Sequence, residues 1–311
     1  MLVNILKREG CACVVGCSAD LFDPYCTYLA CKKLQVPFIF YAFDDYVAQY
    51  LNQNDLFFSQ KYGPEILKNA DIVLVPNEFL RDCYYAQYKI NAIVIHNPVK
   101  LKDYEMVNTI SKRSDKELSI VYTGAIYEAH YDAFSNLNKA IEQLSDLKII
   151  FNIYSDQELP KEILSERNHI IYHKHQHNSL MPLIQKEADL LFLPLAFHSV
   201  YEDHIIDTAS PAKMGEYLAA KKPILVHAPS NSFVVWYFKK YNCGAVADSE
   251  NIDDLSEKLR QILTNSSFQN EITNNAWERA CQDFDEIKVQ SQFFEILNGY
   301  ISVDMIDDFS T

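Results

Sequence analysis

The sequence predicts an α/β protein built from two doubly wound, parallel-sheet domains. Short apolar runs rich in Val and Ile show no alternation with polar residues, which is typical of strands buried on both faces. A helical pattern follows nearly every run, as in successive βαβ units. The polar stretch 99–117 separates two such series and is expected to be an interdomain linker. With 311 residues, 49% of them hydrophobic, the chain can fill two packed cores.

The first series, residues 1–98, predicts a partial N-terminal domain. Its expected strands are "CACVVG", "VPFIFYAF", "ADIVLVPN" and "NAIVIHNPV". Its expected helices cover residues 24–34, a segment near 61–69, and 77–88.

The second series, residues 118–285, shows the same alternation of strands and helices and predicts a second sheet, in a C-terminal domain. Its expected strands are "LSIVYTGAI", "LKIIFNIYS", "HIIYH", "ADLLFLPL", "KPILVHA" and "CGAVAD". Helices are expected near 133–145, 179–187, 211–220, 231–241 and 252–263, and the segment 266–298 is expected to be helical throughout, so that 286–311 forms a C-terminal helix and tail. Both domains are therefore expected to be Rossmann-like, with ligands at the carboxyl ends of the strands in a cleft between them.

Composition excludes several classes of function. The chain has 28 basic and 42 acidic residues, a formal charge of -14, which argues against binding nucleic acid through a general basic surface. No apolar run reaches the ~20 residues that span a bilayer. The cysteines crowd into apolar runs near the start, where reduced thiols behave as small hydrophobes, so "CACVVGC" is interpreted as a buried strand. These features predict a cytoplasmic protein, with a place at the inner face of the membrane left open.

Two further stretches invite a special role. "HIIYHKHQHNSL" contains alternating histidines that would share one face of a strand end, but no Asp, Glu or Cys completes a ligand set, so no metal site is predicted. The aromatic run 233–241, "FVVWYFKKY", favours a packed amphipathic helix, and a peripheral membrane contact is the alternative.

The stretch "ASPAKMGEYLA" carries the most chemistry. Ser210 is a good N-cap and Pro211 suits the first helical turn, so free N–H groups are expected to face an anion. Lys213 adds a positive charge, and Glu216, one turn later on the same face, offers two acceptor oxygens suited to a vicinal diol such as a ribose. The alternative is an ion pair on a solvated helix face, worth ~0.2–0.5 kcal/mol. Spacing alone leaves both open.

The longer segment "ASPAKMGEYLAAKKPILV" resembles the donor-site segment of GT-B nucleotide-sugar glycosyltransferases of the group 1, retaining type. "IVYTGAI" before it and "EADLLFLPL" directly upstream match the same family, and the resemblance covers roughly residues 10–298. It implies the GT-B fold with residues 118–285 as the nucleotide-sugar donor-binding domain. It also implies a shortened first domain, because further βα units would precede the first strand in a complete one.

The resemblance also implies roles for individual residues. Glu216 would hold the donor ribose, and Lys174 and His175 would lie near the nucleotide base. The diphosphate would be bound by one loop before the glutamate and by a facing loop after the second domain's first strand; these residues are Ser210, Pro211, Ala212 and Lys213, and Thr123, Gly124 and Ala125.

In the first domain, "VPFIFYAFDDYVAQY" resembles the strand and loop where relatives carry a histidine and an aspartate near the transferred sugar. Asp44 stands at the histidine position and Asp45 keeps the aspartate, so both are predicted catalytic residues, with a carboxylate acting as general base. The alternative is an aspartate pair that caps the next helix.

Two departures from the family pattern bear on activity. Thr208 stands where many retaining members have a second glutamate, and no Arg or Lys follows the strand in "YTGAIYEAHYD". They favour a second hypothesis, a noncatalytic GT-B-like subunit of a glycosylation complex.

The leading hypothesis is a hexosyltransferase-type glycosyltransferase that moves a sugar from a nucleoside diphosphate sugar, with a UDP-sugar favoured, to an acceptor hydroxyl. The acceptor would be a carbohydrate, a lipid-linked sugar or a protein, in surface polysaccharide or glycoconjugate synthesis. No metal and no cofactor are expected. An oligomer or a partner subunit stays open.

Overall fold

The computed structural model describes residues 1–107, 117–160 and 169–299. The chain forms two compact units: unit 1 contains Met1–Asn97 and the chain from Ile287 onward, and unit 2 contains Pro98–Glu286. The predicted C-terminal helix therefore belongs to unit 1. Parts of the predicted linker and tail, residues 108–116 and 300–311, lie outside the described residues.

Unit 1 is built on a four-stranded parallel sheet, as predicted. Its strands are β1 (Val14–Cys17), β2 (Phe38–Tyr41), β3 (Ile72–Val75) and β4 (Ile93–Val94), in the order β1-β2-β3-β4. The helices of its N-terminal segment, Met1–Asn97, are α1 (Leu2–Glu9), α2 (Asp23–Leu34), α3 (Gln53–Asn69) and α4 (Glu78–Tyr88). Helix α1 was not predicted. Helix α3 begins earlier than expected because the side chain of Asn52 accepts hydrogen bonds from the backbone N–H groups of Asn54 and Asp55, a strong N-cap.

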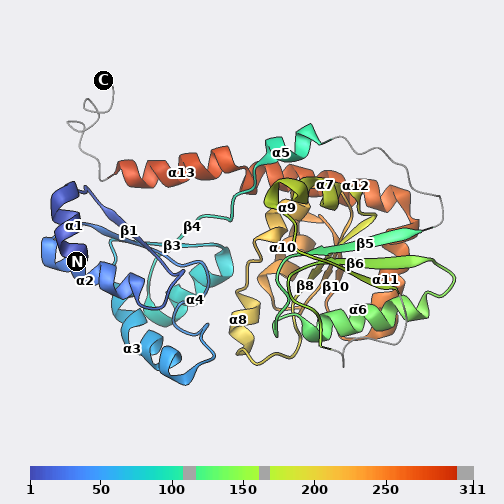
Figure 1. Ribbon diagram of the computed structural model, residues 1–311, viewed down its shortest axis with the longest axis horizontal. Coiled ribbons are helices and arrows are strands. Elements are labelled where there is room, and N and C mark those ends of the chain that lie inside the picture. Colours follow the sequence, from blue (N-terminus) through green and yellow to red (C-terminus); the bar gives the residue numbers. More distant parts are fainter. Residues whose placement is uncertain (108–116, 161–168, 300–311) are drawn as a thin grey trace. The chain divides into compact units, whose positions relative to one another are not determined.

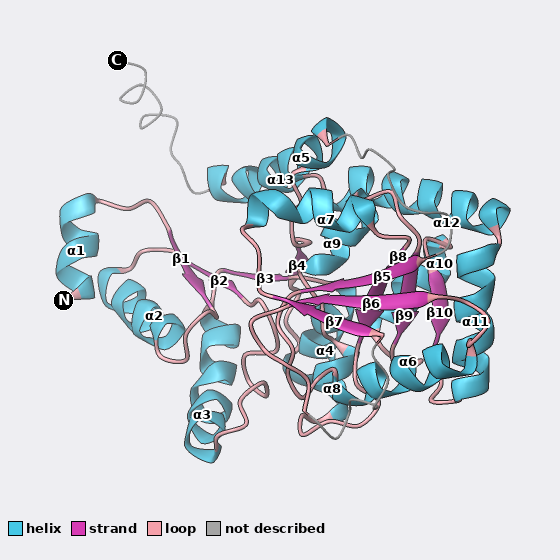
Figure 2. Ribbon diagram, turned by 45° about the vertical axis from the view of Figure 1, so that its right-hand side comes forward, coloured by secondary structure: helices cyan, strands magenta, loops and turns pink. Residues whose placement is uncertain are grey.

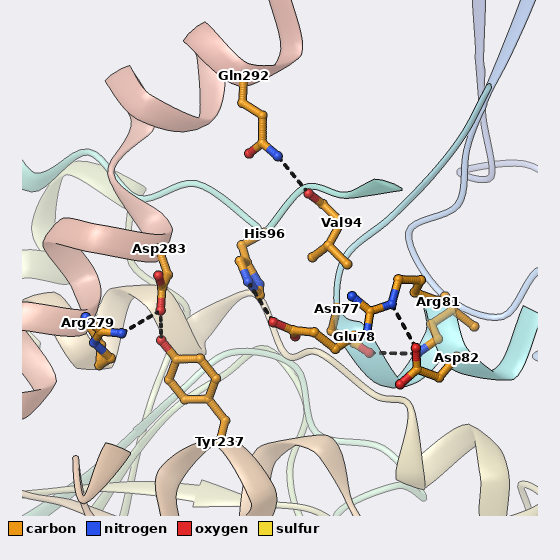
Figure 3. Close-up of polar contacts among 11 residues, drawn as sticks. Asn77, Glu78, Arg81, Asp82, Val94, His96, Tyr237, Arg279, Asp283 and Gln292 are labelled. Atoms are coloured by element: carbon orange, nitrogen blue, oxygen red, sulfur yellow. Dashed lines mark hydrogen bonds and ion pairs between the residues drawn. The ribbon is translucent and has the colours of Figure 1, made fainter. Parts of the chain in front are cut away.

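The second face of this sheet is covered by α13 (Glu286–Asn298), the last helix of the chain (Figure 1). Alternate residues of β2 face opposite sides: Phe38 and Phe40 pack with the helices of the N-terminal segment, whereas Ile39 packs in the cluster that contains Val289 of α13. Gln292 of α13 also donates a hydrogen bond to the carbonyl oxygen of Val94 (Figure 3). The sheet is thus buried on both faces only after the chain returns from unit 2.

Replacing Phe293 with alanine is expected to destabilise unit 1 by about 2 kcal/mol, since this half-buried ring stacks on Tyr41 at a centroid distance of 6.2 Å. The adjacent Phe294 is 56% exposed, so Phe294→Ala is the matched control and is expected to change stability by less than about 0.5 kcal/mol. Hydrogen exchange of the β2 amides measures the effect on unit 1 directly. Equal protection of β2 in the two variants would contradict the packing role of α13.

Unit 2 contains a six-stranded sheet in which every pair is parallel, which confirms the predicted fold class. Its strands are β5 (Leu118–Thr123), β6 (Ile149–Tyr154), β7 (Ile170–His173), β8 (Leu190–Pro194), β9 (Ile224–His227) and β10 (Ala245–Ala247), in the order β10-β9-β8-β5-β6-β7. Its helices are α5 (Leu101–Met106), α6 (Tyr131–Gln143), α7 (Met181–Glu187), α8 (Asp203–Asp207), α9 (Lys213–Ala219), α10 (Phe233–Tyr241), α11 (Ile252–Thr264) and α12 (Ser266–Arg279). Figure 2 shows helices on both faces of this sheet. Phe134, Phe151 and Phe192 pack ring against ring in its core.

Three features of unit 2 differ from the sequence prediction. The stretch expected to be a linker contains α5, and α8 was not predicted. The C-terminal helical segment is interrupted by a π-helical turn at Ala280–Phe284. Directly after that turn, Val99 bridges Asp285 through backbone hydrogen bonds from Val99 N–H to Phe284 O and from Glu286 N–H to Val99 O. These bonds need the extended backbone of Asp285, which ends the helix before α13 begins.

Among the described residues, no helix is both long enough and apolar enough to cross a membrane. The aromatic run at 233–241 forms α10, as predicted, and its apolar side chains Phe233, Val234, Val235, Tyr237 and Phe238 are buried in unit 2. Tyr237 donates its hydroxyl to Asp283 beside Arg279 (Figure 3). Most apolar side chains of α10 are therefore packed in the core and are not available for a membrane contact.

Candidate donor site

The centre of the candidate site is the carboxyl end of β5, where Gly124 faces Lys213 at the start of α9. Gly124 has φ +124°, and a Cβ at this position would lie 3.0 Å from Cε and 3.4 Å from Nζ of Lys213. The ammonium group lies over the ring of Tyr122, 4.8 Å from its centroid. Glycine is therefore needed at position 124 both for the backbone conformation and for the close approach of the lysine.

The environment of Lys213 favours the binding of an anion beside its ammonium. Burial lowers the pKa of Lys213 to about 8, and the attraction of nearby Glu216 only partly opposes this. The residue as a whole is partly exposed, whereas its ammonium lies against Gly124 and the Tyr122 ring. An anion beside it would offset the loss of hydration that burial causes.

Glu216 is held by a network that the sequence did not suggest. Nε2 of Gln185, on α7, donates hydrogen bonds to Oε2 of Glu216 at 2.8 Å and to Oγ1 of Thr123 at 3.1 Å. Oε1 of Gln185 accepts a hydrogen bond from the hydroxyl of Tyr104, on α5, at 2.7 Å. Gln185 is fully buried and Tyr104 is 4% exposed. No sequence motif could reveal these partners, because they come from two other helices.

A buried tyrosine on α9 joins this helix to the end of β5. The backbone N–H of Thr123 donates to the hydroxyl of Tyr217 at 2.9 Å, and Tyr217 is completely buried. Two residues further along, the carbonyl oxygen of Ala125 accepts a hydrogen bond from the hydroxyl of Tyr122. The predicted residues Thr123, Gly124 and Ala125 therefore form a loop fixed to α9 on one side and to its own strand on the other.

His130, at the start of α6, is a second polar group that sequence reasoning missed. It is 1% exposed, and among the described residues its Nδ1 has no hydrogen-bond partner. Its ring lies against Tyr127, with centroids 4.4 Å apart. Burial and the positive charge of Lys213 hold the pKa of His130 well below its usual range, so the imidazole stays neutral. The histidine in "YEAHYD" was the signal in the sequence that could have indicated it.

The start of α9 differs from the prediction. Its N-cap is Ala212, which makes no side-chain capping bond, and the helix begins at Lys213. Ser210 is buried two residues before this cap, and the carbonyl oxygen of Pro211 accepts the N–H of Met214 at 2.8 Å. The prediction of Ser210 as N-cap was wrong because a backbone turn at Pro211 begins the helix instead. Lys213 and Glu216 nevertheless lie on one face, as predicted.

The histidine-rich stretch lies at the edge strand of the sheet. β7 ends at His173, whose ring stacks on Tyr154 at 4.3 Å, so His175 and His177 are not on the strand and do not share its face. Lys174 and His175 are exposed in the following loop, and neither contributes to the hydrogen bonds of the Gln185 network. Their predicted contact with the nucleotide base stays a prediction.

The predicted catalytic pair belongs to unit 1, after β2. Asp45 is 4% exposed, and its Oδ1 accepts hydrogen bonds from the N–H of Val47 at 3.1 Å and from the hydroxyl of Tyr84 at 3.4 Å. Asp44 is exposed, although partial desolvation of its carboxylate and the negative charge of Asp45 raise the pKa of Asp44 to about 6. Asp45 thus stabilises its own loop, and Asp44 is the better placed of the two to meet a substrate.

At the position of the missing second glutamate, the hydroxyl of Thr208 donates to the carbonyl oxygen of His204 in the preceding turn. The neighbouring carboxylate of Asp207 accepts a hydrogen bond from Asn231. Within the described ranges, no group of three or more His, Cys, Asp or Glu side chains is arranged to hold a metal ion.

Comparison with known proteins shows the family of the chain. The family model "Glycosyl transferases group 1" matches residues 110–279, more than half of the chain. No curated protein matches the sequence.

Solved structures show the same fold at low sequence identity. A glycosyltransferase from Rickettsia africae is 15% identical, with a TM-score of 0.72 over 97% of this chain and 80% of that one. A sucrose-phosphate synthase from Thermosynechococcus elongatus is 13% identical, with a TM-score of 0.71 over 96% and 77%. Anabaena HepE, solved with UDP-glucose, is 12% identical, with a TM-score of 0.69 over 92% and 78%. The chain therefore belongs to the group 1 glycosyltransferases and has the GT-B fold that its sequence predicted.

Proposed function

We propose that this enzyme transfers a sugar from a nucleoside diphosphate sugar, most simply a UDP-sugar, to an acceptor hydroxyl. The observation that carries the proposal is the arrangement of Lys213 and Glu216 on one face of α9, opposite Gly124 at the end of β5. It provides one cation for a diphosphate and one carboxylate for a ribose. The structure of HepE with UDP-glucose supports the choice of uridine.

In this scheme Lys213 stabilises the charge that develops on the leaving diphosphate, a form of electrostatic catalysis by a preorganised group. Glu216 accepts hydrogen bonds from the ribose through Oε1 and the remaining lone pair of Oε2, since Gln185 engages one lone pair of Oε2. The scheme uses no metal ion.

On the acceptor side, Asp44 would take the proton from the attacking hydroxyl. Its pKa of about 6 leaves the carboxylate ionised at neutral pH yet basic enough to act in catalysis. The acceptor classes that we propose are a carbohydrate, a lipid-linked sugar or a protein, in surface polysaccharide or glycoconjugate synthesis. They rest on the family alone.

The donor assignment is tested by thermal stabilisation with UDP, GDP and ADP. A nucleotide at 100 times its dissociation constant is expected to stabilise the folded state by about 2.7 kcal/mol. Glu216→Ala should remove most of this stabilisation by the nucleotide that binds, whereas Glu257→Ala, at an exposed glutamate on α11 of the same unit, should leave it unchanged. If none of the three nucleotides stabilises the protein, or if Glu216→Ala behaves like the control, the donor site has been placed wrongly.

Thr208 at the second glutamate position is the observation that favours the alternative of a noncatalytic subunit. The two are separated by incubating the chain with UDP-glucose and UDP-N-acetylglucosamine. Slow release of UDP that depends on Glu216 supports the enzyme, whereas UDP binding without release from either donor supports the subunit.

A further inference from the structure

Gln185 is a fully buried amide in the middle of unit 2, and the proposed reaction does not require it directly. It lies on α7, 62 residues after Thr123 and 31 residues before Glu216 in the sequence, yet its side chain forms hydrogen bonds with both. Every polar atom of its amide is engaged: the nitrogen donates twice, and the oxygen accepts from Tyr104. A buried polar group without hydrogen bonds lowers the stability of the fold, so the hydrogen-bond partners of this amide indicate what it does.

The network fixes the direction of the amide. The carboxylate of Glu216 can only accept hydrogen bonds, so the amide nitrogen of Gln185 faces it, and the amide oxygen accepts from the hydroxyl of Tyr104 at 2.7 Å. Rotating the amide by half a turn would place its oxygen against that carboxylate and lose the hydrogen bond to Glu216, whereas the hydroxyls of Tyr104 and Thr123 can each donate or accept.

Tyr104 is itself held in place. Nζ of Lys186, the residue after Gln185, donates to the carbonyl oxygens of Tyr104 at 2.8 Å and of Val107 at 2.7 Å, so α5 is fastened to α7. The chain Tyr104–Gln185–Glu216 therefore runs from one fixed helix, through a buried amide, to a half-buried carboxylate at the edge of the site.

We propose that Gln185 is a positioning residue that orients the Glu216 carboxylate toward the ribose and so sets the preference for a donor with free ribose hydroxyls. Because the amide engages Oε2, the other oxygen is held in one direction, and a ribose meets a carboxylate that has already lost its rotational freedom. A site prepared in this way discriminates strongly against a ligand that lacks the hydroxyls, since Oε1 would be left without its partners. The inference rests on the proposed function of Glu216.

The test compares the affinity of UDP with that of 2′,3′-dideoxy-UDP by calorimetry. For the unaltered protein we expect UDP to bind at least about tenfold more tightly, the effect of a hydrogen bond to a charged group. Glu216→Ala should reduce this ratio to about 1. Gln185→Met, which keeps the side-chain length but has no donor, should reduce the ratio to about threefold or less, because the carboxylate is no longer oriented.

Two further variants separate positioning from stability. Asn138→Leu removes a different buried amide of unit 2, whose Oδ1 lies 2.6 Å from Nε2 of His169; it should cost stability and leave the UDP ratio unchanged. Tyr104→Phe removes the hydroxyl that holds Gln185 and should give an intermediate ratio, and it carries the test if Gln185→Met does not fold.

The outcomes distinguish the two proposals. If Glu216→Ala abolishes the ratio but Gln185→Met and Tyr104→Phe retain the full value, Gln185 does not position the carboxylate and the donor site stands. If the unaltered protein binds UDP and its dideoxy analogue equally, or binds neither, the assignment of Glu216 to the ribose has failed first.

Discussion

Replacing Lys213 with glutamine is expected to lower kcat/KM for sugar transfer by about 100-fold or more, the cost of removing a preorganised charge from the leaving group. The loss should appear in kcat as well as in KM, because the charge on the diphosphate increases in the transition state. The fold should be retained, since burial already disfavours the ammonium and lowers the pKa of Lys213 to about 8. Steady-state kinetics with a UDP-sugar measures the effect. A variant with unchanged kcat would show that Lys213 takes no part in the chemistry.

The same lysine predicts a pH dependence of nucleotide binding. The pKa of Lys213 in the free protein is about 8, and a bound diphosphate favours the protonated form, so binding takes up a proton above this pH. The affinity for UDP should thus be constant below pH 8 and fall by up to about tenfold per unit above it. Lys213→Arg is the control, because arginine stays charged and should bind UDP with no such loss. Dividing the UDP affinity of the unaltered protein by that of Lys213→Arg at each pH cancels any effect of titration of the nucleotide itself.

Replacing Gly124 with alanine is expected to weaken UDP binding by about tenfold or more, since the new methyl group occupies the space that Lys213 uses. A Cβ would lie 3.0 Å from Cε of Lys213, and the φ of +124° is strained for any L side chain, at about 1–3 kcal/mol. The lysine side chain must shift by a few tenths of an ångström, and with it the charge. Calorimetry with UDP measures the change in affinity.

Gly10→Ala separates the two causes. Gly10 also has a positive φ, +62°, but nothing lies within 4 Å of its added Cβ. It ends α1 in unit 1, so the substitution should destabilise the fold by about 1 kcal/mol and leave UDP affinity unchanged. If Gly124→Ala binds UDP as tightly as Gly10→Ala does, the close approach of Lys213 has no part in binding.

The sheets could be predicted because their signal is local. Phe38–Tyr41 and Leu190–Pro194 are apolar on consecutive residues, and only a strand covered on both faces buries such a run. The helix carrying Lys213 and Glu216 was predicted for a similar reason, since a spacing of three residues places both side chains on one face of any helix. Errors arose at the ends of elements, as at Ser210 and Gln53, where a cap or a backbone turn decides the boundary.

The sequence by itself determined the class of fold, the parallel sheets and the pairing of a lysine with a glutamate on one face of a helix. Each of these depends on residues close together in the chain. Only the tertiary structure decided that α13 covers the second face of the first sheet, and that Gln185 and Tyr104 hold Glu216. Such contacts join segments far apart in sequence, and their energy comes from burial and from satisfying polar groups, neither of which is recorded in any local pattern.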